Sequence, residues 1–99
     1  MSTAVDIDEK IEQVVSTPDQ YKVVVLNDDH TPMDFVIEIL TSVFKHTPEN
    51  ARDLTMKIHQ EGSAICGIYT FEIAEQKSIE ATTVSRNAGF PLQLRIEKE

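Results

Sequence analysis

The sequence has 99 residues and a formal net charge of −8 at pH 7, with 17 acidic and 9 basic side chains. This length predicts one domain with a small core, and the lack of a basic stripe argues against binding nucleic acid or an anionic membrane surface. The single cysteine, Cys66, excludes an intramolecular disulfide and is compatible with a reducing compartment.

Residues 1–20 are predicted to form a flexible acidic tail. They contain no aromatic residue, and they hold five acidic side chains against one lysine. No basic region followed by an apolar one marks a secretory signal here, and no apolar run in the chain is long enough to span a bilayer. Four apolar residues at helical spacing allow a short helix to form on contact with a partner: Ile7, Ile11, Val14 and Val15. We expect the folded domain to span residues 21–99.

The folded part begins with a predicted strand over residues 21–26, whose continuously apolar centre indicates an inner strand. A helix is predicted over residues 32–45, with Thr31 as its N-cap and Pro32 at the first helical position. Its apolar residues recur at helical spacing: Met33, Val36, Ile37, Leu40, Val43 and Phe44.

A second helix is predicted over about residues 48–61, because Thr47 and Pro48 repeat the cap-plus-proline start and Gly62 is a natural stop. Its inner face holds three apolar residues: Ala51, Leu54 and Ile58.

The last third of the chain predicts a strand over residues 64–69, a helix over about 71–88 and a strand over 91–97. Thr70 can cap the helix and Gly89 can close it. The helix has a face of small residues, namely Ala74, Ser78, Ala81, Ser85 and Ala88, and the final strand places Leu92, Leu94 and Ile96 inward. The order β-α-α-β-α-β predicts a compact α+β domain, with three helices on one face of a three-stranded, largely antiparallel sheet.

The turn after the first strand carries the candidate binding groups Asn27, Asp28 and Asp29. Several hydrogen-bond acceptors presented in one direction suit a small cation such as an amine. His59, at the edge of the core-facing stripe of the second helix, is the best candidate for a fourth member. The alternatives are a solvated turn, since Asn and Asp favour turns for backbone reasons alone, and a structural histidine.

Other chemistries have weaker support in the residue pattern. The potential metal ligands Asp28, Asp29, His30, His46, His59 and Cys66 lack the close spacing of zinc ligands on one element. No glycines cluster into a phosphate-binding loop, and no nucleophile is placed beside a base. We therefore expect neither a metal or cofactor nor an enzymatic activity, with a small hydrolase as the remaining catalytic alternative.

Several separate blocks of the chain resemble the ClpS family, the adaptors of the bacterial N-degron pathway. The similarity covers nearly all of residues 20–99, and the strongest block is Asn27-Asp28-Asp29-x-Thr31-Pro32-Met33. Further blocks include Gly62-x-Ala64-Ile65-Cys66-Gly67 and Glu72-x-Ala74-Glu75-x-Lys77. A domain of this shape also resembles the C-terminal domain of the ribosomal stalk protein, so the fold alone does not decide the function.

The resemblance implies a protein that binds the free N-terminus of substrates beginning with Leu, Phe, Tyr or Trp. The residues matching Asn27, Asp28 and His59 would hold the α-amino group, with Asp29 supporting the turn by accepting hydrogen bonds from the backbone and Thr31 by capping. The first side chain of the substrate would enter an apolar pocket lined by Met33, Val36, Thr55, Ile58 and Leu92. Thr55 departs from the family pattern, in which a larger apolar residue such as Met is common, so we expect an altered preference among substrates.

The resemblance also implies a monomeric bacterial cytoplasmic protein that delivers its substrates to the ClpA unfoldase of the ClpAP protease. The positions matching the surface that docks on the N-terminal domain of ClpA include Glu72 and Lys77 on the third helix. The acidic tail would then be the part engaged by the ClpA ring. The alternatives are an ordinary salt-bridged helix face and a docking-only regulator that inhibits or redirects ClpA without a working substrate pocket.

Overall fold

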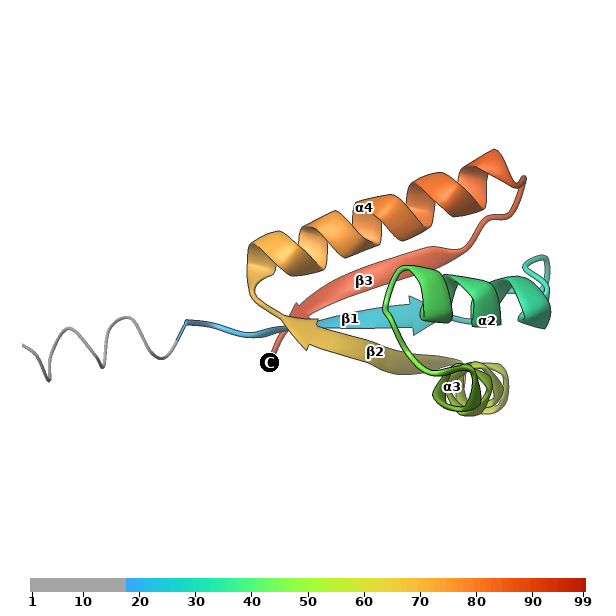
Figure 1. Cartoon of the computed structure of the whole chain (residues 1–99), viewed down its shortest axis with the longest axis horizontal. Coiled ribbons are helices and arrows are strands. Elements are labelled where there is room, and N and C mark those ends of the chain that lie inside the picture. The colour runs from blue at the N-terminus through green and yellow to red at the C-terminus, as the bar shows by residue number, and fades with distance from the viewer. Residues whose placement is uncertain (1–17) are drawn as a thin grey trace, which may run out of the picture.

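The computed structural model describes residues 18–99, so the predicted acidic tail lies almost entirely outside the described residues. The described part contains three strands and three helices in the predicted order (Figure 1). Their bounds are β1 Tyr21–Leu26, α2 Met33–Ser42, α3 Pro48–Glu61, β2 Ser63–Tyr69, α4 Phe71–Asn87 and β3 Gln93–Lys98. The predicted α+β class is therefore confirmed. None of these helices is both long and apolar enough to cross a membrane.

The sheet has the strand order β2-β1-β3, and both pairings are antiparallel. As the apolar sequence of β1 predicted, this strand is central, and Val23 and Val25 are fully buried. One buried cluster joins these two residues to Ile39 of α2, Ile58 of α3 and other residues that include two alanines of α4. Figure 1 shows α4 lying along the sheet, with α3 seen end-on beside β2.

A β-bulge interrupts the pairing of β2 with β1. Val23 lies opposite Gly67 and Val24 lies opposite Ile65, which leaves Cys66 as the extra residue. The Cys66 carbonyl instead accepts a hydrogen bond from His46 Nε2 over 2.6 Å. This bond ties the bulge to the segment between α2 and α3. Gly67, an isolated glycine inside the strand, is a local signal for a bulge, but nothing in the sequence identifies His46 as its partner.

The ends of α2 differ from the predicted range of 32–45. Pro32 is the N-cap and makes no side-chain capping bond, while Val43 is the C-cap. The chain then turns at Lys45, whose φ of 61° is left-handed although the residue is not glycine, and the His46 N–H bonds to Leu40 O over 3.0 Å. Val43 and Phe44 are still buried beyond the helix, which explains why their periodicity predicted a longer one.

The other helices match their predicted starts and stops more closely. Thr47 caps α3 by accepting a hydrogen bond from the Asn50 N–H over 3.2 Å, and Gly62 ends the helix at φ 95°. Thr70 has the backbone conformation of an N-cap for α4 but makes no side-chain capping bond. On the predicted small face of α4, Ala74, Ala81 and Ser85 are buried, whereas Ala88 lies past the helix and is exposed.

The final strand begins at Gln93, two residues later than predicted. Leu92 lies just before it and is still only 1% exposed. Leu94 and Ile96 are partly buried against the core, as the alternation predicted. Leu92 is therefore part of the core through the loop that precedes the strand.

Candidate functional site

The turn between β1 and α2 is organised around the carboxylate of Asp28. Its Oδ1 accepts hydrogen bonds from the backbone N–H groups of His30, over 2.8 Å, and Thr31, over 2.7 Å. Its Oδ2 accepts a hydrogen bond from the Thr31 hydroxyl over 2.8 Å. Thr31 therefore supports the turn as predicted, but by binding Asp28 instead of capping α2.

These contacts set the ionisation of Asp28. Burial raises the pKa of its carboxyl, but the hydrogen bonds from the Thr31 hydroxyl and from the N–H groups of His30 and Thr31 outweigh that effect, and the pKa lies below its ordinary value. The carboxylate is therefore fully charged at neutral pH. Each carboxylate oxygen has two acceptor sites, so Oδ2 keeps acceptor capacity beyond its bond to Thr31.

A backbone hydrogen bond joins this turn to the end of α3. The Asn27 N–H donates to Gly62 O over 2.9 Å, and His59 lies in the last turn of α3, just before Gly62. The side chains of Asn27 and His59 are both exposed. Asn27, Asp28 and His59 thus belong to two segments that the backbone holds together, although Asn27 and His59 are 32 positions apart in the sequence.

Asp29 differs from its neighbour. Its side chain is exposed, and it accepts none of the side-chain hydrogen bonds found among residues 18–99. The predicted support of the turn by Asp29 through contacts with the nearby backbone is therefore not seen. Asp28 makes those contacts instead, because its side chain lies where two consecutive N–H groups converge.

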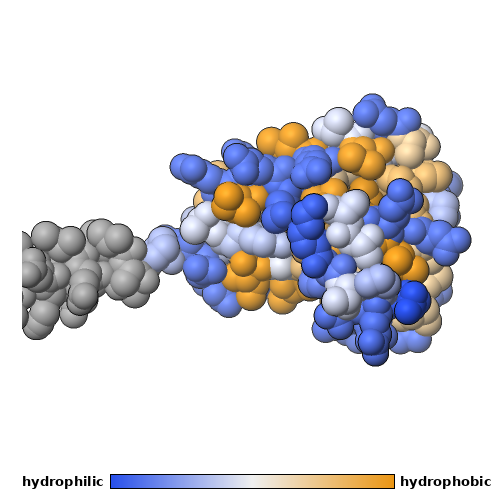
Figure 2. All heavy atoms as spheres, viewed as in Figure 1, coloured by the Kyte–Doolittle hydropathy of each residue, from blue (hydrophilic) through white to orange (hydrophobic). Residues whose placement is uncertain are grey.

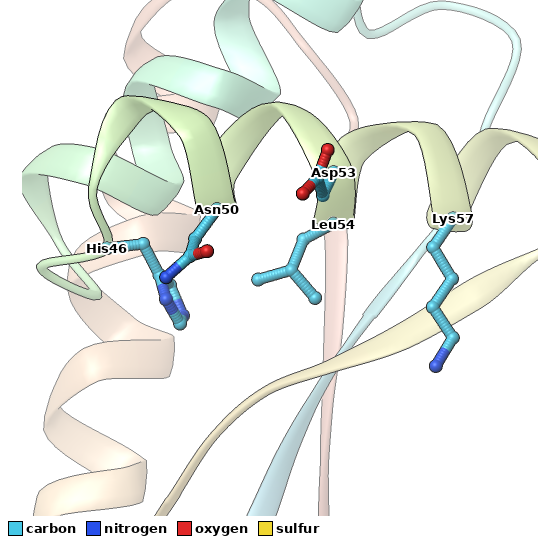
Figure 3. Close-up of a pocket in the computed structure, with 5 residues that line it drawn as sticks. All are labelled: His46, Asn50, Asp53, Leu54 and Lys57. Carbon is cyan, nitrogen blue, oxygen red and sulfur yellow. The ribbon is translucent and has the colours of Figure 1, made fainter.

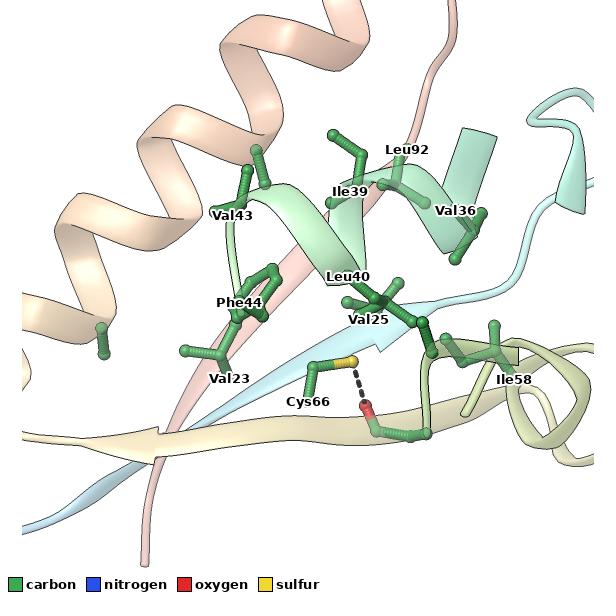
Figure 4. Packing of buried hydrophobic residues seen from close by; sticks show 14 residues of the cluster. Val23, Val25, Val36, Ile39, Leu40, Val43, Phe44, Ile58, Cys66 and Leu92 are labelled. Atoms are coloured by element: carbon green, nitrogen blue, oxygen red, sulfur yellow. Dashed lines mark hydrogen bonds between the residues drawn. The ribbon is translucent and has the colours of Figure 1, made fainter. Parts of the chain in front are cut away.

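The five residues predicted to line an apolar pocket come from α2, α3 and the loop before β3. Val36, Ile58 and Leu92 lie in one buried cluster, and Figure 4 shows them among the core side chains. Met33, at the start of α2, is 37% exposed. The structure thus brings Val36, Ile58 and Leu92 together in the core from three separate segments. Beyond the turn, a hollow of about 580 Å³ is lined by residues on both sides of Leu92, including His30, Phe90 and Gln93.

Thr55 is buried, with 2% of its surface exposed. Its hydroxyl donates to the Ala51 carbonyl over 2.7 Å, one turn earlier in α3. The hydroxyl is therefore satisfied within the helix and adds no free donor to a pocket wall. Compared with a larger residue at position 55, threonine therefore differs mainly in the smaller size of its side chain.

The two predicted docking residues have different surroundings on α4. Glu72 is exposed in the first turn. Lys77 is partly buried, donates from Nζ to the Val43 carbonyl over 2.9 Å, and lies 5.6 Å from the centre of the Tyr69 ring. Lys77 therefore links α4 to the end of α2, an intramolecular role that the sequence did not indicate.

Two further features bear on other chemistries. Burial raises the pKa of the Cys66 thiol to about 12, so the thiol stays protonated and is a poor nucleophile or metal ligand; Figure 4 shows it within the core. Within residues 18–99 no three His, Cys, Asp or Glu side chains are grouped so that they could hold a metal ion. A hollow of about 330 Å³ beneath α3 shares no residue with the predicted site (Figure 3).

Comparison with known proteins places this turn and fold in a family. Residues 16–95 match the family model for the ATP-dependent Clp protease adaptor protein ClpS. The ClpS adapter of Maricaulis maris is 42% identical over 90 residues, which cover 91% of this chain and 83% of the relative. The ClpS adapter of Burkholderia thailandensis is 46% identical over 90 residues, covering 91% and 86% respectively.

A solved structure agrees with this assignment. The structure of Agrobacterium tumefaciens ClpS2 bound to L-phenylalaninamide has a TM-score of 0.81 and 42% sequence identity, and the match covers 84% of this chain and 100% of that one. Both the sequence and the fold of the described residues therefore match the same group of proteins. The chain belongs to the ClpS family of ATP-dependent Clp protease adaptor proteins.

Proposed function

We propose that this ClpS protein binds the free N-terminal residue of proteins that begin with Leu, Phe, Tyr or Trp, and delivers them to ClpA. The observation that carries the proposal is the charged Asp28 carboxylate, held by Thr31 in a turn that is bonded to the end of α3. The related ClpS2 bound to L-phenylalaninamide supports it, because that molecule has a free α-amine next to a bulky apolar side chain.

The α-amine is the part of the substrate that the turn would recognise. An N-terminal amine has a pKa near 8 and is mostly charged at neutral pH, and it presents three N–H donors. The amide oxygen of Asn27, the Asp28 carboxylate and a ring nitrogen of His59 are acceptors that can take these donors directly or through water. A hydrogen bond to a charged group contributes about 1.5–3 kcal/mol, so an acetylated N-terminus, which lacks the charge and two donors, would be rejected.

The first side chain of the substrate would enter an apolar pocket lined by residues of α2, α3 and the loop before β3. Met33 is the exposed member and would lie at the rim, whereas Val36, Thr55, Ile58 and Leu92 are buried and would form the interior. Side chains branched at Cβ would overlap the entrance at a cost of about 1–3 kcal/mol. The site would therefore favour Leu, Phe, Tyr and Trp over Ile and Val.

Delivery to the protease needs a second surface and a segment that the unfoldase can engage. We assign the first role to α4, with Glu72 and Lys77, and the second to the acidic tail of residues 1–20, while residues 21–99 form the binding domain. ClpS proteins are adaptors and not proteases themselves, so the protein would release its substrate to ClpA unchanged. These steps place it in the bacterial cytoplasm.

Fluorescence anisotropy with short labelled peptides that differ only at residue one tests the substrate site. We expect binding to free N-terminal Leu, Phe, Tyr or Trp, and none to Ile, Val or acetylated Phe. Asn27→Ala and His59→Ala should each weaken binding of the Phe peptide, whereas Asn50→Ala on exposed α3 surface is the matched control. If no peptide bound while ClpA docking persisted, the protein would be a docking-only regulator.

A separate assay tests delivery. Degradation by ClpAP of a reporter with an N-terminal Phe should require this protein and should be lost when residues 1–16 are removed, while peptide binding stays intact. Unchanged degradation after the truncation would show that the tail has no part in delivery. Glu72→Lys should reduce ClpA binding without changing the affinity for peptide.

A further inference from the structure

The loop between α4 and β3 supplies one residue to the proposed pocket for the first side chain. This residue is Leu92, which is 1% exposed and lies in the same buried cluster as Val36 and Ile58 (Figure 4). The other four residues of the proposed pocket belong to α2 and α3, whose backbones are held by their own helical hydrogen bonds. Leu92 lies outside any helix or strand, one residue before β3 begins at Gln93. Its position therefore depends on what holds the loop.

The end of α4 fixes the first half of this loop. Gly89 has a φ of 85°, a left-handed conformation that suits glycine. Its N–H donates to Arg86 O over 3.0 Å, and the Phe90 N–H donates to Ser85 O over 2.8 Å. These two bonds form a Schellman motif, which is a common way to end a helix. The path of the chain after α4 is thus determined as far as Phe90.

The side chain of Arg86 fixes the second half of the loop. Arg86 lies in the last turn of α4. Its Nη1 donates to Phe90 O over 3.0 Å and to Leu92 O over 2.8 Å. Because each terminal nitrogen of the guanidinium carries two hydrogens, both bonds can form at the same time. The carbonyls on either side of Pro91 are therefore bonded to one side chain of α4.

A hollow borders the loop on one side. It has a volume of about 580 Å³ and is lined by loop residues together with Arg86 and with His30 of the Asp28 turn, so packing does not hold the loop from that side. Figure 2 shows hydrophilic and hydrophobic residues side by side at the end of the molecule where α4 ends. On the side of α2, the Phe90 ring contacts the Phe35 ring, with the ring centroids 4.8 Å apart. Arg86 and this ring contact thus tie the loop to α4 and to α2.

The guanidinium of Arg86 is not used in an ion pair. Neither of the two ion pairs found among residues 18–99 includes it, although the chain has 17 acidic residues. The planar guanidinium presents its donors in a fixed arrangement, which suits it to orient two carbonyl groups. The contacts of Arg86 therefore act on the backbone that carries Leu92.

We propose that Arg86 is a positioning residue for the pocket that takes the first side chain of the substrate. It holds the loop so that Leu92 stays in place against α2 and α3. This inference rests on the proposed binding of free N-termini. Without the two bonds, the loop would also adopt conformations in which it moves into the hollow and Leu92 is displaced. Only the held conformation would bind, so the apparent affinity would fall with the fraction of molecules that adopt it.

This mechanism has its own signature in binding measurements. A smaller competent fraction weakens the binding of every first residue by the same factor, because the pocket is unchanged once it has formed. The loss lies in the association rate, and the dissociation rate stays the same. A residue that touched the substrate would instead alter the ranking of Leu, Phe, Tyr and Trp. A residue that acted only on overall stability would leave the affinity of the folded protein unchanged.

Anisotropy titrations and stopped-flow kinetics of Arg86→Met test the proposal, with peptides that begin with Leu, Phe, Tyr or Trp. We expect the affinity to fall about fivefold for all four peptides, through slower association. The Phe90 N–H should also exchange with solvent faster than in the wild type, because the loop opens more often. Phe90→Leu, which removes the ring contact with Phe35, is a second and independent test and should weaken binding in the same uniform way.

The control is Arg52→Met, which removes an arginine from the exposed surface of α3 and should bind all four peptides like the wild type. All variants should keep the wild-type circular dichroism spectrum. Unchanged affinity in Arg86→Met would overturn the proposal, and so would a changed ranking of the peptides, which would place Arg86 in contact with the substrate. If the wild type bound none of the peptides, the proposed function would fail together with this inference. Equal binding by the wild type and Arg86→Met would remove only the role of Arg86.

Discussion

Thr31 contacts both carboxylate oxygens of Asp28. Its hydroxyl donates to Oδ2 over 2.8 Å and its backbone N–H donates to Oδ1 over 2.7 Å. The residue that looked like a helix cap from the sequence therefore fixes an anion instead. Since the next carboxylate, Asp29, makes no such contact, the two adjacent aspartates have different roles: one is held in place and the other is exposed to solvent.

Replacing Thr31 by Val should destabilise the protein by about 1.5 kcal/mol at pH 7, the low end of the range for a hydrogen bond to a charged group, because the bond to the partly exposed Asp28 carboxylate is lost. The pKa of Asp28 is lowered in the folded state, so the stability it contributes is present above its ordinary value of 3.8 and is lost as the pH falls through the lower folded-state pKa. The difference between the wild type and Thr31→Val should therefore shrink at pH 3. Urea unfolding at pH 7 and pH 3 measures this difference in the free energy of unfolding.

Thr83→Val, on the exposed surface of α4, is the matched control for that experiment and should change the free energy of unfolding by less than about 0.5 kcal/mol. A Thr31→Val effect of equal size at pH 7 and pH 3 would mean that the hydroxyl does not act through the Asp28 carboxylate.

Substituting Thr55 by Met should change the ranking of N-terminal residues. The longer Met side chain would reduce the space in the proposed pocket. Peptides that begin with Trp or Phe should therefore lose more affinity than peptides that begin with Leu, by about 1 kcal/mol or roughly fivefold in Kd. Thr55→Val should leave the ranking as it is, because the hydroxyl that it removes is already bonded to Ala51 O. Anisotropy titrations of both variants test this, and an unchanged ranking in Thr55→Met would place residue 55 outside the pocket.

Lys77→Met should lower the free energy of unfolding by about 1.5–3 kcal/mol, because Met keeps most of the apolar stem but loses the charged hydrogen bond to Val43 O. Lys57→Met on α3 serves as the control, with an expected change under about 0.5 kcal/mol. Chemical denaturation gives both values. If the two variants were equally stable, the Lys77 ammonium would be free for a partner.

Gly67→Ala should destabilise the domain by about 1–3 kcal/mol through overpacking. A Cβ at this position would overlap the Tyr69 side chain, which folds back over Gly67. In a Tyr69→Leu background, Gly67→Ala should lower the free energy of unfolding much less, because the tyrosine ring that the new Cβ would overlap is absent. A double-mutant cycle measured by urea unfolding gives this coupling, and a cost independent of residue 69 would mean that the backbone, not the ring, excludes a side chain.

Local sequence was sufficient for α3. Thr47 and Pro48 at its start and Gly62 at its end act through their own backbone conformations, so no distant residue is needed to predict these limits. The same holds for β1, where a short run of β-branched valines favours a strand buried on both faces. The family resemblance rested on such local blocks, and it was confirmed by relatives and by a solved structure.

Contacts between distant segments account for features that the sequence did not predict. α2 ends at Ser42, before the predicted limit, and the chain then turns at Lys45, a non-glycine residue in a left-handed conformation. The Cys66 carbonyl in the β2 bulge is hydrogen-bonded to His46, twenty positions earlier in the sequence. Lys77 donates a hydrogen bond to the carbonyl of Val43, thirty-four positions earlier. Such bonds depend on where whole elements pack, and residue type alone does not encode that.

The candidate site combines both kinds of information. By itself, the sequence determined which residues supply acceptors and apolar surface, because the chemistry of a carboxylate, an amide or a leucine belongs to the side chain. Only the tertiary structure decided that the end of α3 lies beside the turn, and that Val36, Ile58 and Leu92 are buried in one cluster. The physical reason is that hydrogen bonding and burial depend on neighbours, which the chain acquires only when its elements pack together.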